Sequence, residues 1–287
     1  MNAIEYINKD TVIIGTISGG KDSTALALWL LHESGLVDTN KIVFVHCDTG
    51  HESIITEQYV NYLQSIFGVI HRIRGKYTFE TLAIKKQRFP SQRARFCTEE
   101  LKVKPLKAWL DQRIYKDAII CQGIRKDESI SRSKMSCFEE DGGYYDWPLW
   151  RPLLDWNVQQ VFDIHKKYEV EPNPLYLMGF DRVGCFPCIM ANKRQIKRSF
   201  DSDPTLLPRL IEMEKKVANA SKRKAGSFFA FDKIPPKFHN RSCVTKNGET
   251  KTYGSIEAVY RWACDPDQSE LDFGPAPTCM SQYGLCE

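Results

Sequence analysis

Residues 11–33, TVIIGTISGGKDSTALALWLLHE, decide the fold, because they have the patterns of a buried strand, a glycine-containing loop and a helix in direct succession. Thr11–Thr16 is a short run rich in Ile, typical of a strand buried on both faces. Asp22–Glu33 has the length and apolar density of a crossover helix, and Gly35 stands where a C-terminal cap belongs. The segment therefore predicts the first strand and helix of an α/β fold.

The loop between them, Ser18-Gly19-Gly20-Lys21-Asp22-Ser23, has the composition of a phosphate site. At such a helix N-terminus, free backbone N–H groups and the positive end of the helix dipole point at an anion. Glycines let the backbone approach closely, Lys21 adds a charge, and the serines add hydroxyl donors. We expect Lys21 and Asp22 to face ligand or solvent. The alternative is an ordinary strand-to-helix turn with an exposed lysine; a Walker loop is excluded, because GxxxxGK[ST] is absent.

Strands and helices continue to alternate beyond this segment. Apolar runs predict further strands at Lys41–Cys47, Val69–Ile73 and Ala118–Cys121, and an edge strand at Tyr144–Pro148. Helices are predicted at Ser53–Phe67, Thr98–Tyr115 and Asn157–Tyr168, the second of them broken or kinked at Pro105. This order predicts a parallel sheet covered by helices on both faces.

The composition is that of a globular protein with one sizeable core, since 42% of the 287 residues are hydrophobic and 26% are charged. No run of 18 apolar residues occurs, so we expect no membrane span. The N-terminus lacks the basic-then-apolar order of a signal peptide, which makes the cytoplasm the expected compartment. Disulfides rarely persist there, so the ten cysteines are expected to include metal or cluster ligands, redox thiols and buried thiols.

Positive charge gathers in Asn192–Lys224, which holds ten Lys or Arg and four acids. Such a segment would bind a nucleic-acid substrate by neutralising phosphates. The alternative is a solvated amphipathic helix that buries Leu206, Leu207, Leu210, Ile211 and Met213. From Pro235 the chain is rich in Pro, Gly and Asn and holds four cysteines, which predicts a loop-rich appendage. These changes predict two parts, residues 1–190 and 191–287.

Four further motifs follow in order along the chain. They are Asp48-Thr49-Gly50-His51-Glu52; Arg95-Phe96-Cys97-Thr98 with Lys102; Gly123-Ile124-Arg125 with Glu128 and Arg132; and Asn173-Pro174-Leu175-Tyr176 followed by Arg182-Val183-Gly184-Cys185-Phe186-Pro187-Cys188. Together with the loop, they resemble the phosphoadenylylsulfate (PAPS) reductase family within the N-type ATP pyrophosphatase superfamily, over about residues 10–190. The resemblance implies an adenine nucleotide alpha hydrolase-like fold, a five-stranded parallel sheet with the nucleotide at the carboxyl edge of the strands.

The resemblance also implies a site for an adenine nucleotide, either ATP or a PAPS-type sulfonucleotide, with Lys21, Asp22 and Arg125 as catalytic residues. Arg125 and Arg132 would clamp phosphate or sulfate. Asp48 would hold Mg²⁺ or orient the ribose, and its alternative role is to cap the following helix. Glu128 is expected to orient an arginine. The predicted nucleotide-binding residues are Ser18, Gly19, Gly20, Lys21, Asp22, Ser23, Asp48, Gly50, Lys102, Gly123, Arg125 and Arg132.

Cys185-Phe186-Pro187-Cys188 resembles the motif that supplies two ligands of a [4Fe–4S] cluster in the adenylylsulfate reductases. The other two ligands of those enzymes are adjacent cysteines, whereas the corresponding place here contains Phe96-Cys97, so one ligand must come from elsewhere. The predicted ligand set is Cys97, Cys185, Cys188 and Cys279, and other candidates for the last position are Cys243, Cys264 and Cys286. The alternatives are no metal at all, or a structural Zn²⁺ held by Cys185, Cys188, Cys279 and Cys286.

The resemblance leaves two chemistries open. PAPS reductases use a C-terminal cysteine in a Glu-Cys-Gly-x-His-like motif, whereas residues 283–287 are Tyr283-Gly284-Leu285-Cys286-Glu287. The acidic groups beside Cys286 disfavour the thiolate that nucleophilic attack requires. We therefore expect ATP pyrophosphatase-type adenylation, which yields AMP and pyrophosphate, coupled to sulfur transfer with Mg²⁺ and a sulfur donor or thiol reductant protein. The alternatives are a sulfite-producing reductase and a non-catalytic nucleotide- or nucleic-acid-binding module.

Overall fold

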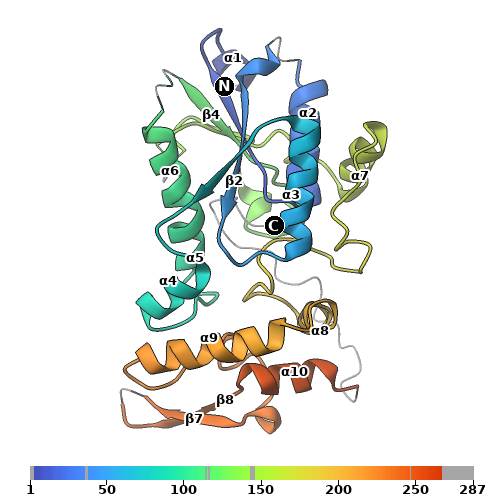
Figure 1. Ribbon diagram of the computed structural model, residues 1–287. Coiled ribbons are helices and arrows are strands. Elements are labelled where there is room, and N and C mark those ends of the chain that lie inside the picture. Colours follow the sequence, from blue (N-terminus) through green and yellow to red (C-terminus); the bar gives the residue numbers. More distant parts are fainter. Residues whose placement is uncertain are drawn as a thin grey trace. The chain divides into compact units, whose positions relative to one another are not determined.

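The computed structural model describes residues 3–35, 38–113, 115, 117–142, 146–245 and 247–266 (Figure 1). The chain divides into two compact units. The first comprises Met1–Lys76, Thr98–Cys185 and Thr278–Glu287, and the second comprises Tyr77–Cys97 and Phe186–Pro277. Within the described ranges, none of the helices combines the length and apolar character needed to span a bilayer.

The first unit is built on one sheet with the strand order β3-β2-β1-β4-β6-β5 in the described part of the chain. Five neighbouring strands are parallel, namely β1 (Val12–Thr16), β2 (Ile42–Asp48), β3 (Ile70–Arg74), β4 (Ala118–Cys121) and β6 (Leu149–Trp150). The predicted α/β class with a parallel sheet is therefore confirmed. The edge strand β5 (Phe138–Glu139) is antiparallel to β6 and was not predicted, because two residues are too few to show a periodicity.

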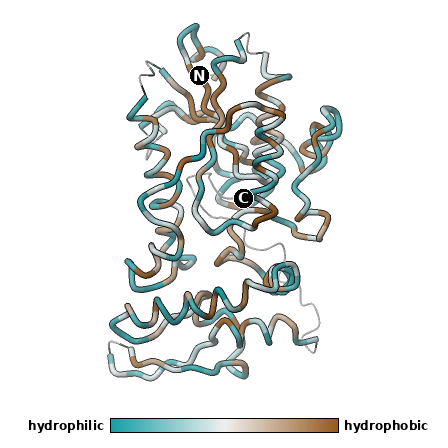
Figure 2. The backbone as a smooth tube through the Cα atoms, viewed as in Figure 1, coloured by the Kyte–Doolittle hydropathy of each residue, from teal (hydrophilic) through white to brown (hydrophobic). Residues whose placement is uncertain are grey.

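Helices cover both faces of this sheet (Figure 1). Alternate residues of a strand point to opposite faces, and in β1 Ile13 belongs to one hydrophobic cluster while Ile14 belongs to the other. The Ile13 cluster packs against α2 (Lys21–His32), α3 (Ile54–Phe67) and α7 (Val158–Lys167). The Ile14 cluster packs against α6 (Lys104–Asp111). Figure 2 shows the resulting hydrophobic colouring of the central strands.

The helix predicted at Thr98–Tyr115 is interrupted. It consists of α5 (Phe96–Thr98), a π-helical turn at Glu99–Val103 and α6, in which Pro105 occupies the first turn. A proline is tolerated there because the first N–H groups of a helix have no intrahelical partner. The predicted edge strand at Tyr144–Pro148 is displaced to β6, and residues 143–145 lie outside the described part. Shorter elements of the first unit are α1 (Ala3–Tyr6), η1 (Thr39–Lys41), η3 (Lys126–Glu128) and η4 (Arg132–Lys134).

The second unit has its own core, made largely of aromatic rings. Phe89 and Phe79 pack on Phe228, with ring centroids 5.3 and 5.7 Å apart. Its elements are α4 (Phe79–Lys86), α8 (Lys193–Ser202), α9 (Leu206–Ala220), η6 (Pro236–Phe238), β7 (Arg241–Val244), β8 (Thr250–Tyr253) and α10 (Ile256–Cys264). The described part of the appendage thus contains a β-hairpin and a helix in addition to loops.

The amphipathic helix considered for the basic segment is α9. Leu206, Leu210 and Met213 are buried, whereas Leu207 and Ile211 are only partly buried. The segment Tyr77–Cys97 was not predicted to belong with α9, because nothing in its local pattern shows that Phe79 and Phe89 fill a core completed more than a hundred residues later. The chain returns to the second unit at Phe186, and the division into residues 1–190 and 191–287 stays a prediction.

A buried carboxylate connects the elements of the second unit. The Glu214 side chain has no exposure and accepts hydrogen bonds from the backbone N–H groups of Phe228 (2.8 Å) and Ile256 (3.1 Å). Arg241 lies 3.3 Å away. Burial raises the pKa of the Glu214 carboxyl to about 7, because these contacts only partly offset its desolvation.

The second unit is therefore expected to lose stability as the pH rises from about 4.5 to about 7 and to change little above that. The folded state binds more protons than the unfolded state in this window, so the free energy of unfolding falls by about 3 kcal/mol. Glu214→Gln should abolish this dependence, whereas Glu249→Gln, at an exposed position between β7 and β8, should not. Hydrogen exchange of the α9 and α10 amides at pH 5 and pH 8 measures the free energy of unfolding of this unit. The same change of that free energy with pH in both variants would contradict the prediction.

Candidate nucleotide site

Most of the predicted nucleotide-binding residues lie at one edge of the sheet. The phosphate loop follows β1, Asp48 ends β2, and Gly123 and Arg125 follow β4. These strands are parallel, so their carboxyl ends meet at the same edge, which is where ligands bind in open α/β sheets. The topology thus brings together three motifs that are distant in sequence.

Two glycines allow the segments at this edge to approach one another. Gly19 has φ +84°, and a Cβ there would lie 2.8 Å from the Thr56 side chain. At Gly123 a Cβ would lie 2.6 Å from the Asp22 carbonyl oxygen. Any larger residue at either position would push the phosphate loop away from α3 or from the segment after β4.

The two loop serines hold the loop itself in shape. The Ser23 hydroxyl accepts a hydrogen bond from the Ser18 N–H (3.1 Å) and donates one to the Gly20 carbonyl (2.9 Å). The hydroxyls of Ser18 and Ser23 are 3.0 Å apart. The loop is therefore preorganised, with the N-terminus of α2 at its end.

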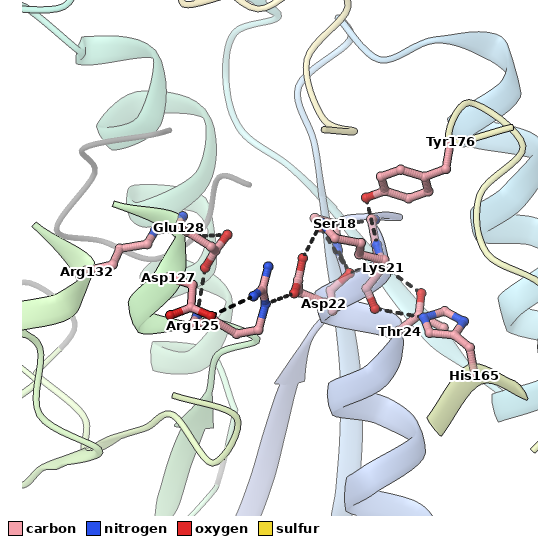
Figure 3. A network of polar contacts seen from close by, with 12 residues as sticks. Ser18, Lys21, Asp22, Thr24, Arg125, Asp127, Glu128, Arg132, His165 and Tyr176 are labelled. Atoms are coloured by element: carbon pink, nitrogen blue, oxygen red, sulfur yellow. Dashed lines mark hydrogen bonds and ion pairs between the residues drawn. The ribbon is translucent and has the colours of Figure 1, made fainter. Parts of the chain in front are cut away.

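Asp22, Lys21 and Arg125 form a buried ion cluster (Figure 3). Lys21 Nζ lies 2.8 Å from Asp22 Oδ2, and Arg125 Nε donates to Asp22 Oδ1. The expectation that Lys21 and Asp22 face solvent or ligand is wrong for Asp22, which has no exposure, and Lys21 is only 8% exposed. Burial favours the neutral carboxyl, but the charges of Lys21 and Arg125 outweigh it and hold the pKa of Asp22 below its ordinary value.

Three residues absent from the predicted site make hydrogen bonds with the backbone of the loop. Asn173 Nδ2 donates to the Gly19 carbonyl (3.0 Å), and the Tyr176 hydroxyl accepts from the Lys21 N–H (3.0 Å). His165 on α7 places Nε2 2.9 Å from the Lys21 carbonyl. The motif containing Asn173 and Tyr176 was visible in the sequence, whereas nothing near His165 indicated its role.

Glu128 orients an arginine, as expected. It pairs with Arg132, whose side chain is almost fully buried, and it accepts a hydrogen bond from the backbone N–H of Arg125 (2.7 Å). Arg132 is thus held by Glu128 (Figure 3). Its predicted role as a phosphate clamp stays a prediction.

The other predicted binding residues lie around β2. Asp48 contacts Arg74 (2.5 Å) and accepts from the Gly50 N–H (2.9 Å), where Gly50 adopts φ +66°. The alternative that Asp48 caps the following helix is wrong, because Ser53 is the N-cap of α3. Lys102 is buried in the π-helical turn.

The predicted metal ligands are divided among the parts of the chain. Cys185 belongs to the first unit and pairs with Glu52 in an isolated bridge, whereas Cys97 and Cys188 belong to the second unit. Cys188 Sγ accepts a weak hydrogen bond from the Met190 N–H (3.5 Å). Cys279 lies outside the described residues. Among the residues that the structure describes, no three His, Cys, Asp or Glu side chains are grouped as metal ligands.

A parallel α/β sheet with a glycine-serine loop and paired cations at its carboxyl edge defines a class of phosphate-binding proteins. The family model for the phosphoadenosine phosphosulfate reductase domain matches residues 12–191, and the chain belongs to this family.

Relatives of known sequence or structure differ in how much of the chain they match. An uncharacterised 37.8 kDa protein from the gpa 5′ region of Escherichia phage 186 is 31% identical over 97% of this chain and 98% of its own length. An adenosine 5′-phosphosulfate reductase from Burkholderia cepacia is 26% identical, over 43% of this chain and 54% of its own. The solved PAPS reductase of Candida auris has a TM-score of 0.48 at 17% identity, and covers 65% of this chain and 85% of its own.

Tyr176 offers a test of the loop. In Tyr176→Phe the Lys21 N–H loses its acceptor, which should lower the free energy of unfolding by about 0.5–1.5 kcal/mol. With saturating inorganic pyrophosphate the difference should vanish, since a phosphate oxygen takes the same N–H. Tyr59→Phe is the matched control, because its hydroxyl donates to the Glu171 carbonyl (2.7 Å), so its cost should not depend on pyrophosphate. Urea unfolding of the two variants and the wild type, with and without pyrophosphate, measures these free energies. If pyrophosphate does not change the loss of stability in Tyr176→Phe, the Lys21 N–H is not a phosphate-binding group.

Proposed function

We propose that this protein is an enzyme that binds an adenine nucleotide at Ser18–Ser23 and transfers its adenylyl group. An acceptor oxygen attacks the α-phosphorus of ATP, the bond from that phosphorus to the pyrophosphate oxygen breaks, and pyrophosphate leaves. A sulfur nucleophile then displaces AMP from the activated acceptor. The observation that carries the proposal is the Lys21–Asp22–Arg125 cluster at the N-terminus of α2.

The cluster suits a polyphosphate because Lys21 and Arg125 share the buried carboxylate of Asp22, and a second carboxylate near Arg125, that of Asp127, is 4.0 Å away and largely exposed. Both cations are buried, so their field is screened less by water than that of surface lysines. The dipole of α2 adds to this field. Positioning and charge of this kind are what transfers at phosphorus require from a protein.

Mg²⁺ would arrive with the nucleotide phosphates and neutralise the leaving pyrophosphate. Of the two aspartates predicted for the site, Asp22 is fully buried between its cations, whereas the Asp48 side chain is 19% exposed. A phosphate-bound Mg²⁺ would therefore compete with Arg74 for Asp48.

A second candidate is reduction of a sulfonucleotide to sulfite and AMP, with two electrons supplied by a thiol reductant protein. The observation that favours it is the similarity to adenosine 5′-phosphosulfate reductases, including that of Burkholderia cepacia. The reaction would use the same loop for the nucleotide phosphate. A third candidate is a module that binds the nucleotide without turnover.

One experiment separates the three. Anaerobically purified protein is incubated with ATP, adenylylsulfate or PAPS, with and without a thiol reductant, and AMP, pyrophosphate and sulfite are measured. Adenylation predicts pyrophosphate and AMP from ATP only when an acceptor is present, because water is poorly placed for attack. Sulfite formation at about 1 per second or faster would overturn it in favour of the reductase. Nucleotide binding without any AMP, pyrophosphate or sulfite would support the third candidate, a module that binds the nucleotide without turnover.

We also propose that Cys185 and Cys188 take part in a thiolate metal site. The support is their spacing and the N–H that Met190 donates to Cys188 Sγ, a contact of the kind that orients a metal ligand. The described residues do not supply a full ligand set, so no step of the reaction is assigned to a metal.

Anaerobic protein is expected to carry about four iron atoms with visible absorption, and Cys185→Ser or Cys188→Ser should each lose them. Cys137→Ser, at an exposed cysteine outside this motif, is the control. Stoichiometric zinc without iron would show a structural zinc site in place of the proposed cluster. Metal-free anaerobic protein would reject both.

A further inference from the structure

The positive charge of the chain is concentrated in its second unit. Residues 77–97 and 186–277 hold 21 Lys or Arg and 12 Asp or Glu, whereas the whole chain holds 40 and 36. The remaining residues therefore carry a net negative charge. An imbalance of this size between two compact units gives the second unit a strong field of one sign.

Two basic runs that are far apart in the sequence both belong to this unit. The first, Lys85–Arg93, follows from the end of α4, and the second, Lys222–Lys224, follows α9. Helices α4 and α9 pack together, with Lys216 Nζ 2.9 Å from Glu80 Oε1. Phe89, inside the first run, packs against Phe228, shortly after the second run, with the ring centroids 5.3 Å apart. The runs therefore flank one aromatic core, an arrangement that the sequence did not reveal.

The cations of these runs face solvent. The exposed members are Lys85, Lys86, Arg88, Arg93, Lys222, Arg223 and Lys224. Several acids of the unit are occupied elsewhere, since Glu214 is buried, Glu80 binds Lys216 and Asp201 binds Lys197. In the described ranges, no carboxylate lies within salt-bridge distance of Lys85, Arg93 or Arg223. We define this set of seven cations as the basic face.

We propose that the basic face binds the phosphate backbone of a nucleic acid. Charges spread over two runs match a polymer of regularly spaced phosphates, whereas one nucleotide would use only a few of them. An anionic membrane would require exposed apolar side chains beside the charges. Val244 on β7 is the large hydrophobic residue exposed among the described residues of this unit, and the others belong to the first unit. The inference does not depend on the chemistry proposed for the nucleotide site.

Fluorescence anisotropy with a labelled 20-nucleotide RNA and the matching DNA, single-stranded and duplex, tests the proposal in the full chain. Binding should weaken steeply with salt. The triple variant Lys222→Ala, Arg223→Ala, Lys224→Ala should lose at least about tenfold in affinity at 0.1 M salt and reduce the salt slope by about 2. The triple Lys85→Ala, Arg88→Ala, Arg93→Ala should do the same, because both runs form one face.

The matched control is Lys9→Ala, Arg113→Ala, Lys166→Ala, which removes three exposed cations of the first unit. It should leave affinity within about twofold, and thermal melts verify that all variants are folded. Equal losses in the control triple, or no binding at 50 mM salt, would overturn the proposal. Tighter binding to anionic vesicles or to polyglutamate of equal charge than to every nucleic acid would also overturn it, in favour of a membrane or an acidic protein.

Discussion

Replacing Asp22 with Asn is expected to lower the free energy of unfolding by about 3–5 kcal/mol, the loss typical of removing one partner of a buried ion pair. Asp22 has no exposure and is the carboxylate shared by Lys21 and Arg125. Without it, Lys21 and Arg125 lose the buried carboxylate that they share, and the Asp127 carboxylate, 4.0 Å from Arg125, is largely exposed. The uncompensated charges, rather than the lost hydrogen bonds, account for most of the effect.

The structure also predicts how this loss responds to ligand. A bound nucleotide supplies negative charge beside Lys21 and Arg125, so ATP should raise the melting temperature of Asp22→Asn by more than that of the wild type. The double variant Asp22→Asn, Arg125→Gln should be more stable than Asp22→Asn alone, because it removes one uncompensated cation. Calorimetry on the three proteins, with and without ATP, measures both effects. An Asp22→Asn protein as stable as the wild type would contradict the cluster's electrostatic role.

Lys21→Met is expected to weaken binding of ATP or a sulfonucleotide by roughly 10–150-fold. The substitution keeps most of the apolar stem and removes a charge-assisted contact to phosphate, worth about 1.5–3 kcal/mol. Arg125 still pairs with Asp22 in this variant, so the fold should survive. Replacing Lys21 should therefore mainly weaken nucleotide binding, whereas replacing Asp22 should mainly lower the stability of the fold.

The matched control is Lys166→Met, because Lys166 is an exposed lysine on α7. It should bind the nucleotide as the wild type does. Isothermal titration with ATP and with inorganic pyrophosphate measures the affinities, and pyrophosphate isolates the contribution of the phosphate contacts. A folded Lys21→Met protein with unchanged affinity for both ligands would exclude this loop as the phosphate site.

The sequence by itself determined the elements whose signals are local. The run Thr11–Thr16, the loop with two glycines and the apolar helix after it form one contiguous pattern, and the structure places β1, the loop and α2 there. The strands at Lys41–Cys47 and Ala118–Cys121 also follow from short apolar runs buried on both faces. Their succession with helices was enough to predict the parallel sheet and the edge at which its motifs meet.

Only the tertiary structure decided which charges neutralise each other. Asp22 is buried because Arg125, 103 residues away, reaches it across the sheet edge, and Asp48 is paired with Arg74 of the neighbouring strand. The support of the loop by His165, and the joining of Tyr77–Cys97 to α9 in the second unit, are likewise contacts between distant segments. Burial and ion pairing depend on distances in space, whereas residue type and spacing along the chain constrain only neighbours within a turn or a strand.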